Sequence, residues 1–457
     1  MSVNNKVLAL VLPASGHINI MSCLVKELVN RKTYNVVFFS TEKYKDLVER
    51  TGARYKKYSN FPDLNLNNEL SVFDIAILLM KAALKVLPEL IQFCEDEKPD
   101  LILCDNGTYY GSFLINYLKT NHNNGRLPFK MPKVVMLHST FAMIENIYPN
   151  SNEINLMIGK KNFGMIIGYF KLYFIQKKIN DRFKLSLPNE MRKVARALAN
   201  ENQLNLCAVL KELQPRAAKL MDRFKFIGCC VSEDVRNFKI NNEKLKLIFN
   251  NFKPINPMLN GERKINEKKL IYISFGTIVN NKTDAFEKII TALDEFELEP
   301  DESNSKIKSE NLEIIISVGS YVYEKFQDKI NNHDYKLPDN ILLLPNVPQI
   351  EILKRASLFI THAGMNSASE TIHYGVPVIC IPIMGDQSLV ALRLCDELNF
   401  GKKLDYNKFT SNQIRTYIHE LLENKKYFEN ILELTKLSRK QNGVETGVNL
   451  IEEYFKQ

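Results

Sequence analysis

The stretch that most constrains the fold of this 457-residue chain runs from 359 to 387. An apolar segment leads through a His-Ala-Gly turn (362–364) into residues with helical spacing, and a second apolar run follows Gly375-Val-Pro. Strand, glycine turn, helix and strand in this order make a βαβ unit, which requires two parallel strands in one sheet. The exposed amides at the start of the helix carry about half a positive charge, so the turn predicts a seat for a phosphate.

The same alternation of short apolar runs and longer amphipathic segments fills the rest of the chain, and it predicts a parallel sheet in each half. The expected strands are residues 7–12, 36–39, 101–104, 134–137 and 224–229 in the first half and 270–275, 313–318, 341–344, 358–361 and 378–381 in the second. Residues from about 239 to 269 are polar and rich in Asn and Lys. We therefore predict an α/β protein with two doubly wound, Rossmann-like domains, 1–245 and 269–457, joined by a linker at 246–268.

Composition narrows the classes of partner and cofactor. The net charge is +9, but Lys and Arg are interleaved with Asp and Glu, which is typical of a solvated surface rather than a nucleic-acid-binding face. The eight cysteines are scattered without a Cys-x-x-Cys pair, so we expect no zinc knuckle or redox motif and a reducing compartment. No stretch approaches the roughly 20 apolar residues of a membrane span, and the first residues lack a signal-peptide pattern. We expect a cytoplasmic protein.

The stretch that begins at the His-Ala-Gly turn resembles the donor-binding signature of the UDP-glycosyltransferases, the family 1 glycosyltransferases. That signature has His, a small residue, Gly, Asn-Ser, a Glu three residues later, Gly-x-Pro and a final Asp/Glu-Gln pair, and this chain has each in order: His362, Gly364, Asn366, Ser367, Glu370, Gly375, Pro377, Asp386 and Gln387. The resemblance implies the GT-B fold, in which two Rossmann-like domains face a central cleft. It also implies that the N-terminal domain binds the acceptor, that the C-terminal domain binds a UDP-sugar, and that the last helix packs back on the N-terminal domain.

The residues of the signature suit the parts of a UDP-sugar. His362 can donate a hydrogen bond to a phosphate oxygen, and Gly364 lets the backbone approach closely. The amides around Asn366 and Ser367, with the serine hydroxyl, suit a diphosphate, and Glu370, one turn on, suits both ribose hydroxyls. The resemblance implies the same roles. The alternative is that His362 and Asn366 only cap the helix.

Two shorter motifs upstream match the same family. Ser274-Phe-Gly276-Thr277 ends an expected strand and matches the Ser-Phe-Gly-Ser/Thr turn that lies beside the phosphates in the family. Asn346-Val347-Pro-Gln349 matches the aromatic-x-Pro-Gln segment, on whose ring the uracil lies. Here Asn replaces the ring, so stacking worth about 1–3 kcal/mol is lost. The Val347 backbone and Gln349 remain to contact the base edge, and the nucleotide is left open between UDP and TDP.

Asp386 and Gln387 follow the last apolar run of the signature. Adjacent side chains that accept and donate hydrogen bonds suit the neighbouring hydroxyls of a hexose. In the family this pair holds the sugar, and Gln in the final place is associated with glucose. We therefore expect UDP-glucose as the donor.

Gly16-His17 follows the first expected strand, and Asp105 ends a later one at the same sheet edge, where open α/β sheets place ligands. Neutral imidazole can remove the proton of an attacking hydroxyl, and a carboxylate can fix its tautomer. The family has this Gly-His and this Asp in these roles. The alternatives are a capping or packing histidine at His17 and a strand-end turn residue at Asp105.

These observations predict an inverting O-glycosyltransferase that moves a hexose from a UDP-sugar to a hydroxyl of a small apolar acceptor. The UDP-sugar is a co-substrate, and no cofactor is expected. No Asp-x-Asp metal motif and no Gly-x-Gly dinucleotide motif occurs. We expect a metal-independent enzyme in which His362 and the helix N-terminus carry the charge of the leaving diphosphate. Two alternatives remain: a non-catalytic sugar-nucleotide or lipid-binding relative, and a UDP-sugar epimerase of the same fold.

The most apolar stretch outside the expected strands is 163–176, FGMIIGYFKLYFIQ. It is too short to span a membrane. Three roles are open for it: a wall of an apolar acceptor pocket, a peripheral membrane contact, or a helix that faces the core.

Overall fold

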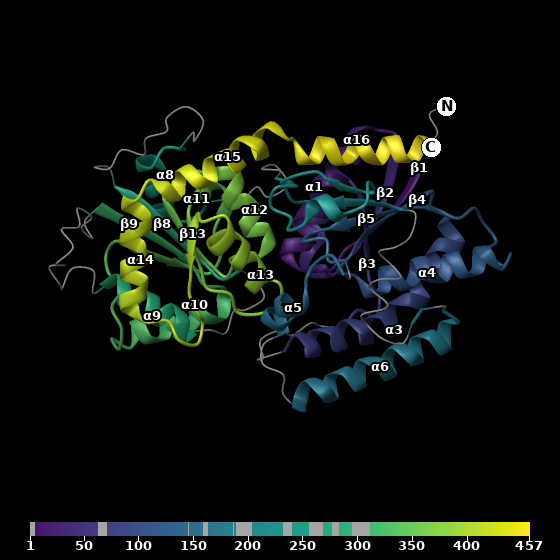
Figure 1. Ribbon diagram of the computed structural model, residues 1–457, viewed down its shortest axis with the longest axis horizontal. Helices are drawn as coiled ribbons and strands as arrows, with labels where there is room; N and C mark the ends of the chain where they lie inside the picture. The colour runs from purple at the N-terminus through teal and green to yellow at the C-terminus, as the bar shows by residue number, and fades with distance from the viewer. Residues whose placement is uncertain are drawn as a thin grey trace. The chain divides into compact units, whose positions relative to one another are not determined.

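The computed structural model describes residues 5–62, 71–144, 146–158, 163–185, 187–188, 203–231, 240–255, 268–276, 283–294 and 311–457. It divides into two compact units. The first comprises Met1–Asn65, Glu69–Arg236 and Gln441–Gln457, and the second comprises Asn237–Lys440. Each unit is built around one parallel sheet covered by helices (Figure 1).

The sheet of the first unit has the strand order β3-β2-β1-β4-β5-β6-β7. Its strands are β1 (Asn5–Leu10), β2 (Tyr34–Ser40), β3 (Arg54–Lys57), β4 (Leu101–Asp105), β5 (Lys133–His138), β6 (Leu204–Cys207) and β7 (Phe224–Phe226). All neighbouring pairs are parallel. The chain reverses its direction of travel across the sheet between β1 and β4, which makes that pair the switch point where ligands bind in such folds.

Helices cover both faces of this sheet, since alternate strand residues point to opposite sides. The helical elements of the unit are α1 (Ser15–Asn30), η1 (Glu42–Tyr44), α2 (Lys45–Glu49), α3 (Val72–Glu97), α4 (Tyr109–Asn123), α5 (Ser151–Ile158), α6 (Phe163–Phe183), η2 (Ala217–Lys219) and α16 (Gly443–Lys456). Val7 and Ala9 join the core formed with α1 and α16. Leu8 and Leu10 join the core formed with α3, α4 and α6.

The sheet of the second unit has the order β10-β9-β8-β11-β12-β13, again with parallel pairs. Its strands are β8 (Lys269–Ser274), β9 (Leu312–Ser317), β10 (Ile341–Leu344), β11 (Leu358–Thr361), β12 (Val378–Cys380) and β13 (Gly401–Lys403). The helices are α8 (Glu243–Asn251), α9 (Thr283–Asp294), α10 (Ser320–Asn331), α11 (Gln349–Leu353), α12 (Met365–Tyr374), α13 (Gln387–Ala391), the π-helical η5 (Leu392–Glu397), α14 (Ser411–Glu423) and α15 (Lys426–Lys440). The switch point lies between β8 and β11.

The expected linker at 246–268 is partly a helix. Residues 246–251 belong to α8, which Asn242 caps by accepting a hydrogen bond from the Leu245 amide. Leu245 and Ile248 are buried, so this polar-looking segment has enough apolar anchors to pack on the second unit. Residues 256–267 lie outside the described ranges.

The second unit ends at Lys440, whereas the predicted domain 269–457 includes the last helix, which the family resemblance places against the N-terminal domain. Residues 441–457 belong to the first unit, where α16 packs on α1 through the buried Val448 and Ile451. Lys133 at the start of β5 donates hydrogen bonds to the carbonyls of Tyr454 (2.8 Å) and Phe455 (3.2 Å).

Residues 163–176, for which the sequence leaves three roles open, form the first part of α6. Among the α6 residues whose side chains are described, Gly168, Leu172, Gln176, Ile179 and Asn180 are buried. Among the described helices, none combines the length and the hydropathy that crossing a bilayer requires.

Candidate active site

His17 and Asp105 lie at the switch point of the first unit. His17 is in the first turn of α1, directly after β1, and Asp105 is the last residue of β4. The N-cap of α1 is Ala14, and no side chain caps this helix. His17 is therefore not a capping residue, and its side chain is 25% exposed while that of Asp105 is fully buried.

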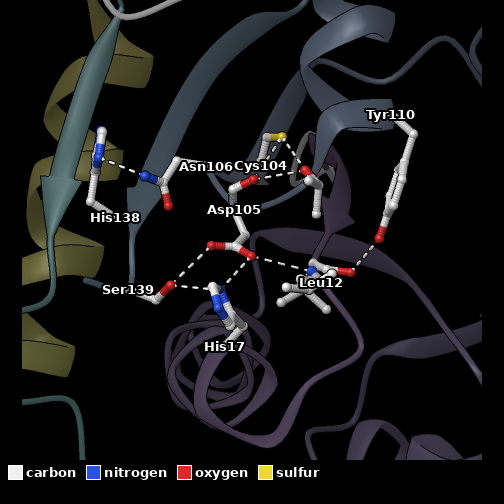
Figure 2. A network of polar contacts seen from close by, with 10 residues as sticks. Leu12, His17, Cys104, Asp105, Asn106, Tyr110, His138 and Ser139 are labelled. Atoms are coloured by element: carbon white, nitrogen blue, oxygen red, sulfur yellow. Dashed lines mark hydrogen bonds and ion pairs between the residues drawn. The ribbon is translucent and has the colours of Figure 1, made fainter. Parts of the chain in front are cut away.

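Three donors converge on the buried carboxylate of Asp105 (Figure 2). Its Oδ2 lies 2.8 Å from Nδ1 of His17 and accepts from the Leu12 amide at 3.2 Å. Its Oδ1 accepts from the hydroxyl of Ser139 at 3.2 Å. A buried carboxyl group needs such partners to offset the cost of leaving water, and these contacts supply them.

The same contacts select one tautomer of His17. Nδ1 faces the Asp105 carboxylate and also the Ser139 Oγ, at 2.7 Å. A carboxylate only accepts, so the proton of a neutral imidazole resides on Nδ1. Nε2 then carries the lone pair, which is the state that a general base requires.

Ser139 and Gly107 belong to this cluster and are not among the residues predicted from the sequence. Ser139 directly follows β5, so the rule that ligands gather at strand ends could have found it. A Cβ on Gly107 would lie 2.9 Å from Cε1 of His17 and 3.1 Å from Oδ2 of Asp105. Only glycine therefore leaves room for the imidazole and carboxylate to meet.

A second polar chain runs beside the first. Asn106 Nδ2 lies 3.1 Å from Nδ1 of His138, whose Nε2 lies 3.1 Å from Oδ1 of Asn205 on β6 (Figure 2 shows the first of these contacts). Burial lowers the pKa of His138, with partial compensation from Asn205. His138 is therefore neutral at physiological pH and has a structural position, while His17 is the more exposed histidine.

In the second unit, His362 lies directly after β11, opposite the turn that follows β8. A Cβ on Gly276 would lie 2.7 Å from Cε1 of His362, and one on Gly364 would lie 2.6 Å from Nε2. The imidazole is thus sandwiched between two glycines, and Gly276 has a left-handed φ of 75°. Ser274 shapes the same turn by accepting a hydrogen bond from the Gly276 amide at 3.3 Å. Thr277 lies outside the described residues.

His362 is uncharged in this environment. Burial lowers its pKa to about 4, and a backbone contact with Ser274 offsets only part of that effect. Its Nδ1 is buried and has no partner with hydrogen-bonding geometry among the described residues. The expectation that His362 carries charge for the diphosphate is therefore refined: near neutral pH it offers one N–H donor rather than a cation.

Glu370 is fully buried on α12, and its two carboxylate oxygens are held by different side chains. Asn366 donates to Oε1 at 2.8 Å, and Gln349 Nε2 donates to Oε2 at 2.6 Å. Gln349 Nε2 also lies 3.3 Å from the Ser367 hydroxyl, and its Oε1 accepts from the Tyr272 hydroxyl at 3.1 Å. Four of the residues predicted for the donor site thus form one network.

The first turn of α12 remains open for an anion. Its N-cap is Gly364, and no side chain caps the helix. His362 and Asn366 are therefore not capping residues, because Asn366 uses its amide group on Glu370 instead. Without a side-chain cap, the helix N-terminus keeps its positive end exposed to a ligand.

Asn346 and Val347 lie at one end of the predicted donor site, and Asp386 and Gln387 lie at the other. Asn346 is exposed after β10, whereas the Val347 side chain is buried. The Gln387 Oε1 accepts hydrogen bonds from the amides of Ile383 (2.9 Å) and Met384 (3.0 Å). Gln387 is the first residue of α13, and Asp386 is the N-cap of that helix. In the described part of the chain, no three His, Cys, Asp or Glu residues gather as metal ligands would.

Comparisons with known proteins match this arrangement. Residues 310–446 match the family described as UDP-glucoronosyl and UDP-glucosyl transferase. The chain is 24% identical to the uncharacterised UDP-glucosyltransferase YojK of Bacillus subtilis, over 99% of this chain and 98% of that protein.

Solved structures give the same result for the fold. The glycotransferase of kitacinnamycin has a TM-score of 0.70 at 20% identity and 99% coverage of both chains. Medicago truncatula UGT71G1, solved with UDP-glucose, has a TM-score of 0.64 at 14% identity, with 100% of this chain and 99% of that chain covered. The two parallel α/β units are the architecture that the GT-B fold requires. Residues 310–446 therefore match the UDP-glucoronosyl and UDP-glucosyl transferase family, and the chain as a whole has the GT-B fold and resembles glycosyltransferase enzymes.

Proposed function

We propose that this enzyme transfers glucose from a UDP-sugar to a hydroxyl of a small apolar acceptor, with inversion at the anomeric carbon. The observation that carries the proposal is the convergence of His17, Ser139 and the Leu12 amide on the buried carboxylate of Asp105. A carboxylate that fixes the tautomer of a partly exposed imidazole is the arrangement that a general base uses to remove a proton.

In the proposed step, Nε2 of His17 takes the proton of the acceptor hydroxyl as its oxygen bonds to the anomeric carbon. The bond from that carbon to the diphosphate oxygen breaks, and UDP leaves with the electron pair. Asp105 stabilises the imidazolium that forms, because its charge lies 2.8 Å from Nδ1. Attack opposite the leaving group turns an α-linked donor into a β-linked product.

The second unit supplies the proposed donor site. Glu370, held by Asn366 and Gln349, accepts from the ribose hydroxyls. The α12 N-terminus and the N–H of neutral His362 bind the diphosphate, with no metal ion required. Ser274 and Gly276 belong to the turn beside the phosphates, for which the sequence also predicts Thr277, and the Val347 backbone contacts the base edge. Asp386 and the Gln387 amide group bind the hexose.

The proposal has a direct test. The protein is incubated with UDP-glucose, UDP-glucuronate, UDP-GlcNAc and TDP-glucose against phenols and sterols, and products are read by mass. UDP-glucose gives a β-glucoside, whose configuration is checked by NMR, and EDTA leaves the rate unchanged. If no donor gives either a product or UDP release, the proposed transferase reaction is wrong.

The base is tested by His17→Ala, which lowers kcat by about 10²–10⁴-fold. His122→Ala is the matched control, because His122 is an exposed histidine at the end of α4 in the same unit. Full activity in His17→Ala would contradict the assignment of the base.

We further propose a cytoplasmic location. All eight cysteines are buried free thiols, which suits a reducing compartment. Fractionation of the source cells tests this proposal, and recovery from an oxidising compartment contradicts it.

A further inference from the structure

The outer side of α6 is apolar although it faces solvent. Gly168, Leu172, Gln176 and Ile179 repeat every three or four residues and form the buried strip against the neighbouring α3. The helices approach closely at Gly168, where an added Cβ would meet the Phe73 side chain at 3.0 Å. In Figure 1, α6 lies alongside α3 at the edge of the first unit.

Five large apolar side chains make up what we call the α6 outer face. They are Ile166 (53% exposed), Ile167 (41%), Phe170 (62%), Tyr173 (40%) and Phe174 (63%). Leu156 of the preceding helix α5 is also exposed, at 51%. Tyr169 of α6 is exposed as well (40%), with its ring edge-on to Phe73 of α3. The other exposed large apolar residues lie on other elements, so such residues concentrate on α6 in the described chain. Clusters of this kind mark interaction sites.

The charge beside this face is mainly positive. Lys171 interrupts it, and Lys177, Lys178, Arg182 and Lys184 are exposed over the turns that follow. Residues 163–184 contain these five cations and one acid, Asp181, which gives a net charge of +4 (five minus one). Exposed aromatic and aliphatic residues with adjoining lysines are the pattern of helices that lie at a bilayer surface.

We propose that the α6 outer face docks on an anionic bilayer surface. Phe170 and Phe174 insert at the boundary between headgroups and acyl chains, while Lys177 and Lys178 pair with lipid phosphates. Charge favours this occupant over a second copy of the chain, because a two-fold contact through α6 would bring two helices of charge +4 together.

Vesicle binding by the full-length protein tests the proposal. Sedimentation is measured with vesicles of phosphatidylcholine alone and of phosphatidylcholine mixed with phosphatidylglycerol. We expect binding to the mixed vesicles, weaker binding to the neutral ones, and loss of binding at high salt. Phe170→Ser combined with Phe174→Ser lowers the partition coefficient by roughly tenfold or more, and Lys177→Glu with Lys178→Glu removes the preference for anionic vesicles.

Matched controls separate this face from general stickiness. Leu247→Ser alters an apolar residue of similar exposure (58%) on α8, and Lys425→Glu with Lys426→Glu alters another exposed lysine pair. Both controls keep wild-type vesicle binding. Circular dichroism and thermal melting check that each variant is folded. Surface substitutions usually change stability little.

Three results would overturn the proposal. The first is that the protein does not bind the vesicles, and the second is that binding persists in the Phe170→Ser, Phe174→Ser variant. The third is a dimer in solution that the same variant dissociates, which would assign the outer face to a second copy. The assay contains no catalytic step, so it can fail while the proposed transferase activity stands.

Discussion

Ser139 is the residue whose position adds most to the active site. Its hydroxyl donates to Oδ1 of Asp105 and lies 2.7 Å from Nδ1 of His17. Ser139 therefore fixes the orientation of the Asp105 carboxylate next to the His17 imidazole. Ser139 acts through these two residues and is a positioning residue rather than the base.

Ser139→Ala should lower kcat by roughly tenfold or more, because a buried carboxylate loses one of its donors. Without the Ser139 hydroxyl, the Asp105 carboxylate interacts more strongly with the protonated His17 imidazole. His17 then keeps its proton to higher pH, so the acid limb of the pH–rate profile moves to higher pH. Ser139→Thr keeps the hydroxyl and should restore the profile. An unmoved acid limb in Ser139→Ala would mean that the hydroxyl only fills space.

His362 should make the protein sensitive to mild acid. Its pKa is 6.5 in the unfolded chain and about 4 in the fold because it is buried. Between those values the unfolded chain binds a proton that the folded one does not, so stability is complete above pH 6.5 and falls as the pH drops toward 4. The loss between pH 7 and pH 5 is about 2 kcal/mol.

Urea unfolding at the two pH values measures this difference, and His362→Asn should reduce it. Burial of His138 lowers its pKa too and adds in the same direction, so part of the acid sensitivity persists in the variant. An identical pH dependence in His362→Asn would show that His362 titrates normally in the folded protein.

Among the elements, α16 joins the first unit from the other end of the chain. It closes the core on one face of the sheet with the buried Val448 and Ile451, beside α1. Gln441, just before it, donates a hydrogen bond to the Phe226 carbonyl at the end of β7 (2.8 Å). The last residues of the chain thereby complete a domain made mostly from the first 236.

Ile451→Ala should cost about 2–5 kcal/mol, as truncation of a buried aliphatic side chain does. Leu437→Ala on α15 is the control: Leu437 is 41% exposed, and its loss should change stability by less than about 0.5 kcal/mol. Denaturant unfolding of both variants measures the difference. Equal stability would mean that α16 contributes little to the fold.

Elements were predictable where their apolar pattern was strong. β10 and β11 have the predicted bounds, because Ile341–Leu344 and Leu358–Thr361 are buried apolar runs. β3 and β13 were missed, since Arg-Tyr-Lys-Lys and Gly-Lys-Lys carry no alternation and lie at sheet edges, where charged residues are usual. β6 was missed because Leu-Asn-Leu-Cys is short and includes a polar residue that turns inward to His138.

At the scale of the whole molecule, the two kinds of predicted site residue fall into different units. His17 and Asp105 are in the first unit and the donor residues are in the second. UDP should therefore stabilise the protein even when His17, the proposed general base, is replaced. At a UDP concentration about 100 times Kd, the gain is about 2.7 kcal/mol.

His17→Ala should keep the UDP-induced rise in Tm, whereas Glu370→Gln should lose most of it, because one oxygen that accepts from Asn366 or Gln349 becomes a donor. Differential scanning fluorimetry with and without UDP measures both. Loss of the UDP effect in His17→Ala would place the nucleotide in contact with the first unit.

The sequence could predict the fold class and the strand ends that carry the candidate site residues, because local pattern carries that information. It could not predict how the side chains share their hydrogen bonds. Ser139 and Gly107 belong to no motif, and their roles arise only when β4, β5 and α1 meet in three dimensions. The Gln387 carbonyl likewise turns to the loop amides, which no spacing rule indicates.

The return of 441–457 to the first unit has a consequence for synthesis on the ribosome. Residues 1–236 leave the ribosome long before α16, with 204 residues (237–440) between them. At about 5–20 residues per second, that interval is roughly 10–40 s. Throughout it the nascent first unit exposes the apolar surface that Val448 and Ile451 later cover, so a chaperone or the growing second unit has time to meet it. The second unit, whose strands are contiguous in sequence, is complete before the first one closes.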